Sequence, residues 1–236
     1  MLAEVLHEVA LLVKPGVTAA ALDLAAQEGI ERRGAHAAFF GYKPDGAAYP
    51  YPATLCVTIN DEVVHGIPTE EKVLQNGDLV MLDLGLSYEG YFADMAMTLF
   101  VGKHDDAGER LIAATREALD AGIAMARPGN RIGDIGAAIE AVARKYGYST
   151  AEGLGGHALG KVQHEAPYIA NTGPANRGEK IVAGMVLALE PIFTEGNGAV
   201  TLDDDQWTYR TEDGSRSAEF EHTIIITEGG CEVVTR

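Results

Sequence analysis

Two aspartates in an otherwise apolar stretch are the first residues whose types could do chemistry. Residues 79–100 read LVMLDLGLSYEGYFADMAMTLF, with Asp83 and Asp94 among leucine, methionine and phenylalanine. Residues 87–90 predict a hairpin turn. A turn centred on its Tyr-Glu dipeptide would make the two aspartates direct cross-strand neighbours, with Cβ atoms about 5 Å apart. Buried carboxylates this close repel each other, so they require a shared proton or a bound cation.

The second half of the sequence holds further ionisable residues in apolar surroundings. Glu190 ends the apolar run MVLALE, and Glu221 precedes the isoleucines of EFEHTIII. His157 lies in the glycine-rich segment GLGGHALG, and His164 follows closely. A single carboxylate at a strand edge is usually solvated, and a single histidine is usually a hydrogen-bonded core residue. Four acids in four apolar strands, taken together, indicate a common site.

The charges of these acids suggest what the site binds. Asp83, Asp94, Glu190 and Glu221 carry four negative charges, which two divalent cations would balance, and the neutral imidazole of His157 offers a fifth ligand. Bridging carboxylates hold two metals about 3.5–4 Å apart in hydrolytic sites. An oxygen-rich set with one histidine suits Mn²⁺, Fe²⁺, Co²⁺ or Zn²⁺ and differs from a four-coordinate structural zinc site. The residues therefore predict a dimetal hydrolase with a shared hydroxide as nucleophile.

The helices that must position these residues come in two similar pairs. Apolar periodicity predicts helices over residues 2–13 and 107–126. Each is followed by Pro-Gly and a second predicted helix, from Thr18 to about residue 33 and over 133–146. The two units read as copies within two related α+β halves, although helical hairpins are common enough to recur by coincidence. Strands are predicted at residues 53–60, 78–86, 91–101, 183–193 and 217–227, and a surface loop at 195–205.

Composition and charge narrow the class of protein. The 236 residues are 47% hydrophobic and 22% charged, which is typical of a globular protein. A net charge of −17 argues against nucleic-acid binding, which requires clustered lysine and arginine. Two cysteines make no disulfide framework, and no stretch resembles a signal peptide or a membrane span. We therefore expect a cytoplasmic enzyme or binding protein that does not contact a membrane.

Five motifs carry a resemblance to a known family. INDEVVHGIP, DLGLSYEGYFADMAMTLF, GHALG with HEAP, LALEPIF and AEFEHTIIIT occur in the order and spacing of type I methionine aminopeptidases. The resemblance covers residues 2–234. It implies the α+β pita-bread fold, in which two pseudo-symmetric halves share a curved antiparallel sheet covered by helices. Residues 1–236 would form one catalytic domain, with halves of about 1–105 and 106–236.

The resemblance also implies roles for individual residues. The enzyme would remove the initiator methionine from nascent proteins and peptides whose second residue is small, with two divalent ions held by the five ligands named above. His65 would contact the substrate near the scissile bond, and His164 would donate a hydrogen bond to the scissile carbonyl. Glu190 would shuttle a proton besides binding metal. The methionine pocket would involve Tyr42, Tyr51, Cys56 and Trp207.

Two departures from the family pattern concern that pocket. The residue before the second catalytic histidine is usually aromatic, and here it is Gln163. Residues 41–52, GYKPDGAAYPYP, look longer than the usual loop and would reshape the rim of the pocket. Both departures bear on how strictly the pocket selects methionine.

Two alternatives remain beside this interpretation. A Xaa-Pro aminopeptidase or dipeptidase would share the fold and the metal ligands, but VVHGIP and Trp207 count against it. A metal-free peptide-binding module is the other, and the intact ligand set counts against that. The expected partner is the N-terminus of a peptide or nascent chain, with ribosome proximity implied by the resemblance, and we expect a monomer.

Overall fold

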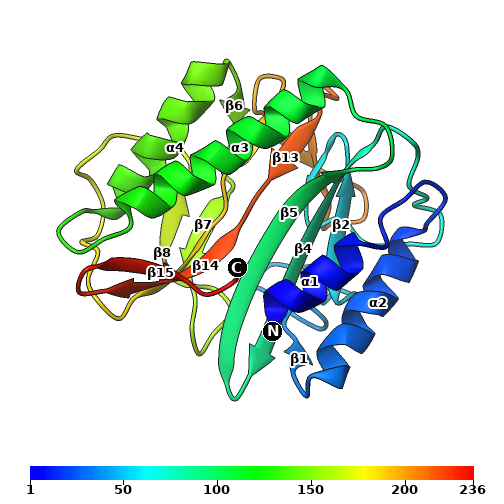
Figure 1. Ribbon diagram of the computed structural model, residues 1–236, viewed down its shortest axis with the longest axis horizontal. Coiled ribbons are helices and arrows are strands. Elements are labelled where there is room, and N and C mark those ends of the chain that lie inside the picture. Colours follow the sequence, from blue (N-terminus) through cyan, green and yellow to red (C-terminus); the bar gives the residue numbers. More distant parts are fainter.

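The helices of the protein form two packed pairs, each followed by strands. The computed structural model describes all 236 residues. Figure 1 shows the first helix of one pair against β4 (Leu79–Tyr88) and β5 (Tyr91–Phe100), and the second pair over the strands of the second half. No helix has both the length and the apolar character needed to cross a membrane. The helices are α1 (Leu2–Ala10), α2 (Ala19–Arg32), α3 (Asp106–Met125) and α4 (Ile132–Tyr146).

All strand pairs are antiparallel and form four sheets. One sheet has β4 (Leu79–Tyr88) paired with β1 (His36–Ala37), β2 (Leu55–Ile59) and β5 (Tyr91–Phe100). The largest has the order β15 (Gly230–Val233), β14 (His222–Thr227), β9 (Val186–Leu189), β7 (Gly155–Ala158) and β8 (Glu165–Ala170). The smaller sheets are β13 (Ser217–Glu219), β10 (Ile192–Thr194) and β6 (Ser149–Thr150), and β11 (Val200–Leu202), β12 (Tyr209–Thr211) and β3 (Glu62–Val64).

The helix predictions agree with the structure apart from the end of the first helix. α1 stops at Ala10, three residues before the predicted end, and Leu11 is exposed. Thr18 caps α2 by accepting a hydrogen bond from the backbone N–H of Ala21. Gly147 ends α4 in the left-handed conformation. Thr18 and Arg131, the N-cap residues of α2 and α4, each form an antiparallel bridge with a later segment of the chain. The two helix pairs therefore resemble each other in this feature as well.

Two predicted strands are interrupted, and a carboxylate lies at each interruption. The predicted strand 183–193 is observed as β9 and β10, with Glu190 and Pro191 between them. Proline has no backbone N–H to donate to a neighbouring strand. The predicted strand 217–227 is observed as β13 and β14, with Glu221 in the gap. The predicted loop at 195–205 contains the short strand β11.

The hairpin of β4 and β5 has a register different from the predicted one. Tyr88 pairs with Tyr91, so the turn is centred on Glu89 and Gly90, both of which have positive φ. Asp83 consequently faces Ala96, and the prediction that it lies directly opposite Asp94 is wrong by two residues. The shift is even, so both aspartates still point to the same face of the sheet as diagonal neighbours.

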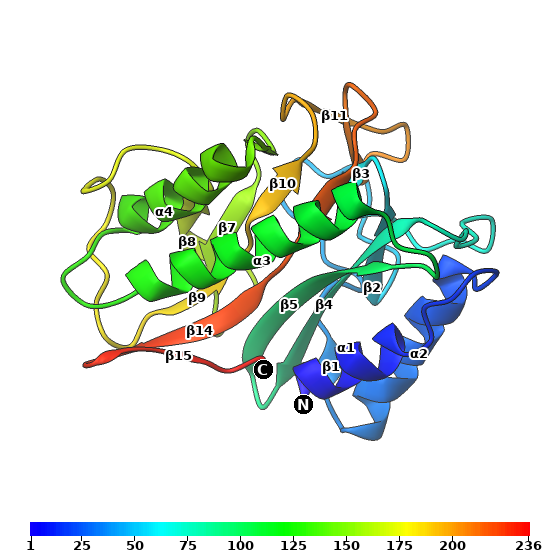
Figure 2. The same ribbon diagram turned by 45° about the horizontal axis from the view of Figure 1, so that its top comes forward.

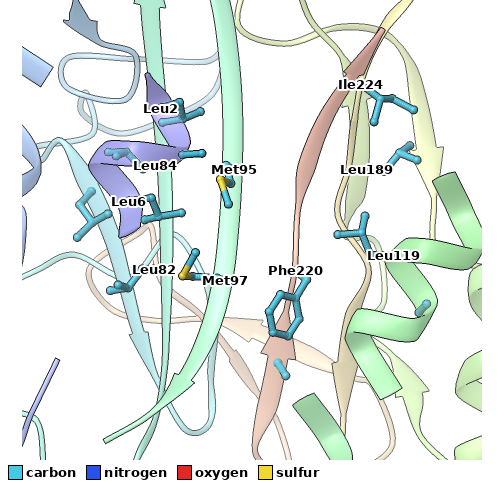
Figure 3. Packing of buried hydrophobic residues seen from close by; sticks show 14 of the residues in the cluster. Leu2, Leu6, Leu82, Leu84, Met95, Met97, Leu119, Leu189, Phe220 and Ile224 are labelled. Carbon is cyan, nitrogen blue, oxygen red and sulfur yellow. The ribbon is translucent and has the colours of Figure 1, made fainter. Parts of the chain in front are cut away.

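The hydrophobic core fills the space between the helices and the sheets. A cluster of 41 buried residues runs from α1 through β4 and β5 to α3, β9 and β14. Figure 3 shows the leucines of α1 beside Leu82, Leu84 and the methionines of β5, and a second group around Phe220. Because this core is continuous, packing of the helices on one face of the strands holds the strands in position.

Hydroxyl groups connect β5 to the strands of the second half. The backbone N–H of Asp94 donates to Thr223 Oγ1 at 2.8 Å, and this hydroxyl donates to the Asp94 carbonyl at 2.8 Å. Thr98 makes the same pair of contacts with the backbone of Glu219. β5 and β14 lie next to each other in both ribbon views (Figures 1 and 2). The acids of the two halves therefore meet across this contact.

Candidate metal centre

One cavity of about 380 Å³ gathers every residue that the sequence assigns to the site. It lies where β4 and β5 meet the strands and loops of the second half. Fourteen residues line it, and they include the five predicted ligands, both histidines and the four predicted pocket residues. The lining residues are Phe39, Tyr42, Pro44, Tyr51, Cys56, His65, Asp83, Asp94, His157, Gln163, His164, Glu190, Trp207 and Glu221.

The acidic end of the cavity is built from side chains of opposite halves. Oxygen atoms of Asp94 and Glu221 and a ring nitrogen of His157 lie within 4.8 Å of one another. His157 Nε2 is 3.9 Å from Glu190 Oε1. Asp83 Oδ1 is buried and has no hydrogen-bond partner. This set of donors fits a divalent cation because it offers converging oxygens, one nitrogen and an unpaired buried carboxylate atom.

The raised pKa values of the acids and their lack of ion pairs also indicate a cation site. Burial raises the pKa of Asp83, Asp94, Glu190 and Glu221 well above the ordinary value of a carboxyl group, and the neighbouring carboxylates raise it further. No lysine or arginine forms an ion pair with any of the four. A cation in the cavity would supply the missing positive charge.

His157 is held in the tautomer that a metal ligand needs. Its Nδ1–H donates to the carbonyl of Ala158 at 3.0 Å, which leaves Nε2 with a free lone pair. Burial lowers the pKa of His157, so the imidazole is neutral at pH 7. β7 pairs with β9 at Ala188 and brings the ring close to Glu190.

The two other histidines lie beside the acids as neutral side chains. Burial lowers the pKa of His65 to about 4. Burial and the nearby histidines His157 and His65 lower that of His164 to about 3. His164 has its ring centroid 4.3 Å from that of His157 and 4.9 Å from that of Tyr42. His65 has a φ of 58°, an unusual value for a residue other than glycine, and such backbone strain is common at functional sites.

Another part of the cavity lining is aromatic and apolar. Tyr51 and Trp207 pack edge to face with centroids 5.1 Å apart, and Phe39 packs edge to face on Tyr51. Cys56 belongs to the same buried cluster. The hydroxyl of Tyr51 donates to the carbonyl of Gly66 at 2.9 Å, so its polar end is already paired. The wall therefore suits an apolar side chain of a ligand.

Several residues of this region were not predicted to belong to the site. Phe39 and Pro44 line the cavity but carry no sequence signal that separates them from ordinary loop residues. Gln163 stands out in the sequence only as a departure from the family pattern. Glu219 is a fifth buried acid, and burial together with the charge of Asp94 raises its pKa to about 8. It lies two residues before Glu221 in the motif AEFEH, and this spacing was a usable signal.

Comparison with known proteins identifies the class to which this fold and site belong. The model of metallopeptidase family M24 matches residues 1–228, and the chain belongs to that family. Its relatives include the methionine aminopeptidase of Aquifex aeolicus, 44% identical over 237 residues that cover 100% of this chain and 92% of the relative. The crystal structure of the Thermotoga maritima methionine aminopeptidase superposes with a TM-score of 0.95 at 40% identity, covering 99% of this chain and 92% of that one. The predicted resemblance and fold class are confirmed.

Peptidases with other names share the fold at lower similarity. The Xaa-Pro dipeptidase of Bacillus anthracis superposes with a TM-score of 0.76 at 22% identity, and this chain spans 57% of its length. This match shows a common fold only. The functional assignment therefore rests on the methionine aminopeptidases, which are more similar to this chain.

Proposed function

We propose that this protein is a methionine aminopeptidase. It removes the N-terminal methionine from peptides and nascent chains whose second residue is small. The observation that carries the proposal is the composition of one cavity. Converging carboxylates, three neutral imidazoles and a group of aromatic side chains line it together. Relatives about 40% identical over the full chain bear the same name, which supports the assignment.

The acidic end would hold two divalent ions, of Co, Mn, Fe or Zn. The ligands would be Asp83, Asp94, His157, Glu190 and Glu221. Their donor types fit such ions, and four carboxylates balance the charge of two. When bound, the ions supply Lewis acidity and activate water for hydrolysis at neutral pH.

The protein's own side chains would perform the remaining steps. His164 is neutral and can donate an N–H to the scissile carbonyl as negative charge develops on its oxygen. His65 would orient the substrate near the scissile bond. Glu190 would carry a proton to the leaving amine. Tyr42, Tyr51, Cys56 and Trp207 would enclose the methionine side chain, and the free α-amino group would lie at the metal-binding end of the cavity.

The wider setting of the reaction belongs to the proposal as well. The whole of residues 1–236 would act as one catalytic domain, built from halves of about 1–105 and 106–236. The enzyme would work as a monomer in the cytoplasm, and it could meet its nascent-chain substrates at the ribosome.

Peptide hydrolysis with defined metals tests the proposal. The protein is stripped with a chelator and reconstituted with Mn²⁺, Fe²⁺, Co²⁺ or Zn²⁺. It is then assayed on Met-Gly-Met-Met and on an Ala-Pro peptide. We expect at least one metal form to cleave only the methionine peptide, releasing free methionine. Preference for the Ala-Pro peptide would instead identify a Xaa-Pro peptidase, and metal-independent binding without cleavage would identify a peptide-binding module.

A substitution at His164 separates chemistry from metal binding. His164→Ala should lower kcat by about 10²–10³-fold, the usual effect of removing an oxyanion donor. Metal content measured by atomic emission should stay at the wild-type value. A variant with unchanged kcat would contradict the role given to His164.

A further inference from the structure

Residues 43–50 (the 43–50 segment) form a closed loop beside the cavity. They lie within the stretch that looks longer than the loop of the family, and the backbone holds the two ends of the segment together. The N–H of Tyr51 donates to the carbonyl of Tyr42 at 2.8 Å, and the N–H of Gly41 donates to the carbonyl of Tyr51 at 2.9 Å. A bond of the first kind closes a β-turn when only two residues intervene. The eight residues of the segment are therefore more than closure of the chain requires.

The 43–50 segment has an ordered backbone of its own. The N–H of Ala47 donates to the carbonyl of Pro44 at 3.1 Å. Gly46, between them, has a φ of 89°, as the third position of a type II turn requires. Pro44 and Pro50 restrict the backbone further, because proline fixes φ. A segment with so little conformational freedom can hold in place the groups that it contacts.

Two side chains of the 43–50 segment contact the aromatic part of the site. Pro44 lines the cavity itself. Tyr49 packs against the buried cluster that contains Trp207, and the two ring centroids are 6.4 Å apart. The hydroxyl of Tyr49 donates to the carbonyl of Asp205 at 2.5 Å. Asp205 belongs to the turn between β11 and β12, and Trp207 lies in the same turn.

Asp205 fixes the conformation of the turn that carries Trp207. One of its carboxylate oxygens accepts the backbone N–H groups of Trp207 and Thr208 at 2.9 and 2.8 Å. The other oxygen accepts the hydroxyl of Thr208 at 2.6 Å. Because the carbonyl of this same residue accepts the Tyr49 hydroxyl, Tyr49 is bonded to the residue that sets the position of Trp207.

We propose that the 43–50 segment limits the length of the first side chain that the cavity accepts. Pro44 would close part of the cavity. Tyr49 would be a positioning residue that keeps Trp207 in place. The inference rests on the proposed aminopeptidase function, in which Trp207 encloses the methionine side chain. One extra methylene is disfavoured about tenfold or more in a hydrophobic pocket, and a lining that can move apart loses this discrimination.

Competition between peptides that differ by one methylene tests this limit. The metal-loaded protein is assayed on Met-Gly-Met-Met and on the same peptide with ethionine as its first residue. We expect the wild type to prefer methionine by about tenfold or more in kcat/KM. Replacing residues 43–50 by Gly-Gly keeps the bond between Tyr42 and Tyr51 as a β-turn, and it should lower the preference about fivefold. Tyr49→Phe removes only a hydroxyl and should lower the preference about threefold, with kcat for the methionine peptide within about twofold of the wild type.

Trp207 can also report its own position, because it is the only tryptophan of the chain. It is 8% exposed, so acrylamide should quench its fluorescence weakly in the wild type. In metal-free Tyr49→Phe we expect the quenching constant to rise at least about twofold, because the turn opens more often without the hydrogen bond. Tyr88→Phe is the matched control. It removes a hydroxyl at an exposed position of β4 and should change neither the quenching nor the preference for methionine.

The outcomes separate this inference from the function on which it rests. If the methionine peptide is cleaved and its advantage over the ethionine peptide is unchanged in both variants, the 43–50 segment does not limit side-chain length and the inference is wrong. Unchanged quenching in folded Tyr49→Phe would overturn the positioning role of Tyr49. If no metal form cleaves the methionine peptide, the proposed function fails and the limit on side-chain length fails with it, whereas quenching of the metal-free protein still shows whether Tyr49 holds Trp207.

Discussion

Asp94 is a side chain that opposes folding of the metal-free protein and that the proposed metal site would require. It is 4% exposed, and one of its oxygens accepts only the backbone N–H of Met95. Burial raises its pKa, and the nearby carboxylate of Asp83 raises it further. In the metal-free protein this carboxyl is destabilising when ionised, whereas a bound cation would make the charge favourable.

Replacement by asparagine should therefore have opposite effects on stability and on metal binding. Asp94→Asn keeps the acceptor for Met95 but removes the charge. We expect it to abolish stoichiometric metal binding and activity, and to raise the melting temperature of the metal-free protein at pH 8 by at least about 2 °C. Calorimetry checks the melting temperature, and titration with Mn²⁺ checks binding.

The matched control is the exposed Asp204→Asn, which should change neither property. At pH 5 the advantage of Asp94→Asn should be smaller, because the raised pKa of Asp94 favours its neutral form as the pH falls. A metal-free Asp94→Asn protein that melts below the wild type at pH 8 would contradict the repulsion argument.

Sequence reasoning predicts residues well when their type is improbable in its surroundings. Carboxylates such as Asp83 and Glu190 are conspicuous inside apolar runs, and all the predicted ligands reach one cavity. Phe39 and Thr223 were missed because an aromatic or a threonine is ordinary in a strand-rich protein. Their importance arises only from contacts with distant segments, such as the hydrogen bonds between Thr223 and Asp94.

At the scale of elements, the close approach of β7 and β9 places His157. A Cβ atom on Gly156 would come within 2.2 Å of the Ala188 carbonyl oxygen on β9. Only glycine allows the two strands to approach this closely, and His157 pairs with Ala188 in the same ladder. The spacing of these strands therefore sets the position of a predicted metal ligand.

Adding one methyl group at this position should disturb both the ladder and the site. Gly156→Ala forces β7 and β9 apart, so we expect a loss of about 1–3 kcal/mol in the free energy of unfolding and weaker metal binding. Urea denaturation and metal titration measure the two effects. Gly229→Ala is the control, because its Cβ would meet no atom within 4 Å, and it should stay within about 0.5 kcal/mol of the wild type.

Periodicity predicted the helices better than the strands. A long apolar stripe with helical spacing, such as that of α3, is easily distinguished from the alternating pattern of a strand. The predicted register of the β4–β5 hairpin was wrong because two neighbouring dipeptides, Tyr88-Glu89 and Glu89-Gly90, could each form the centre of the turn. Only the backbone pairing shows which of them does. Short strands such as β3 and β7, with three and four residues, hold too few residues to show a clear alternating pattern.

At the scale of the whole molecule, the buried acids make stability depend on pH. Burial and nearby carboxylates raise the folded-state pKa values of the acid cluster, to about 8 for Glu219. Their contribution to stability is complete below the unfolded-state pKa of about 4 and is lost as pH rises through the folded-state values. His65 and His164 have lowered pKa values, so their effect on the free energy of unfolding has the opposite sign: stability rises with pH. This rise is complete above the unfolded-state pKa of histidine, about 6.5. Between pH 6.5 and 8, the dependence of the free energy of unfolding on pH is therefore set by the acids alone.

We therefore expect the metal-free protein to lose stability over this range. Each carboxyl that stays protonated contributes a slope of about 1.4 kcal/mol per pH unit, so the free energy of unfolding should fall by at least about 1 kcal/mol from pH 6.5 to 8. The metal-loaded protein should show no such fall, because bound cations favour the ionised carboxylates. Urea titrations at several pH values measure both forms. A metal-free protein that gains stability over this range would contradict the pKa assignments.

The hydroxyl contacts between β5 and the second half suggest that the chain could work as two pieces. Residues 101–105, between β5 and α3, connect the segment with Asp83 and Asp94 to the segment with Glu190 and Glu221. Neither fragment produced by a cut there contains the complete set of donors. Joint expression of the fragments would restore hydrolysis only when they associate, so the enzyme could serve as a split reporter whose signal depends on reassembly.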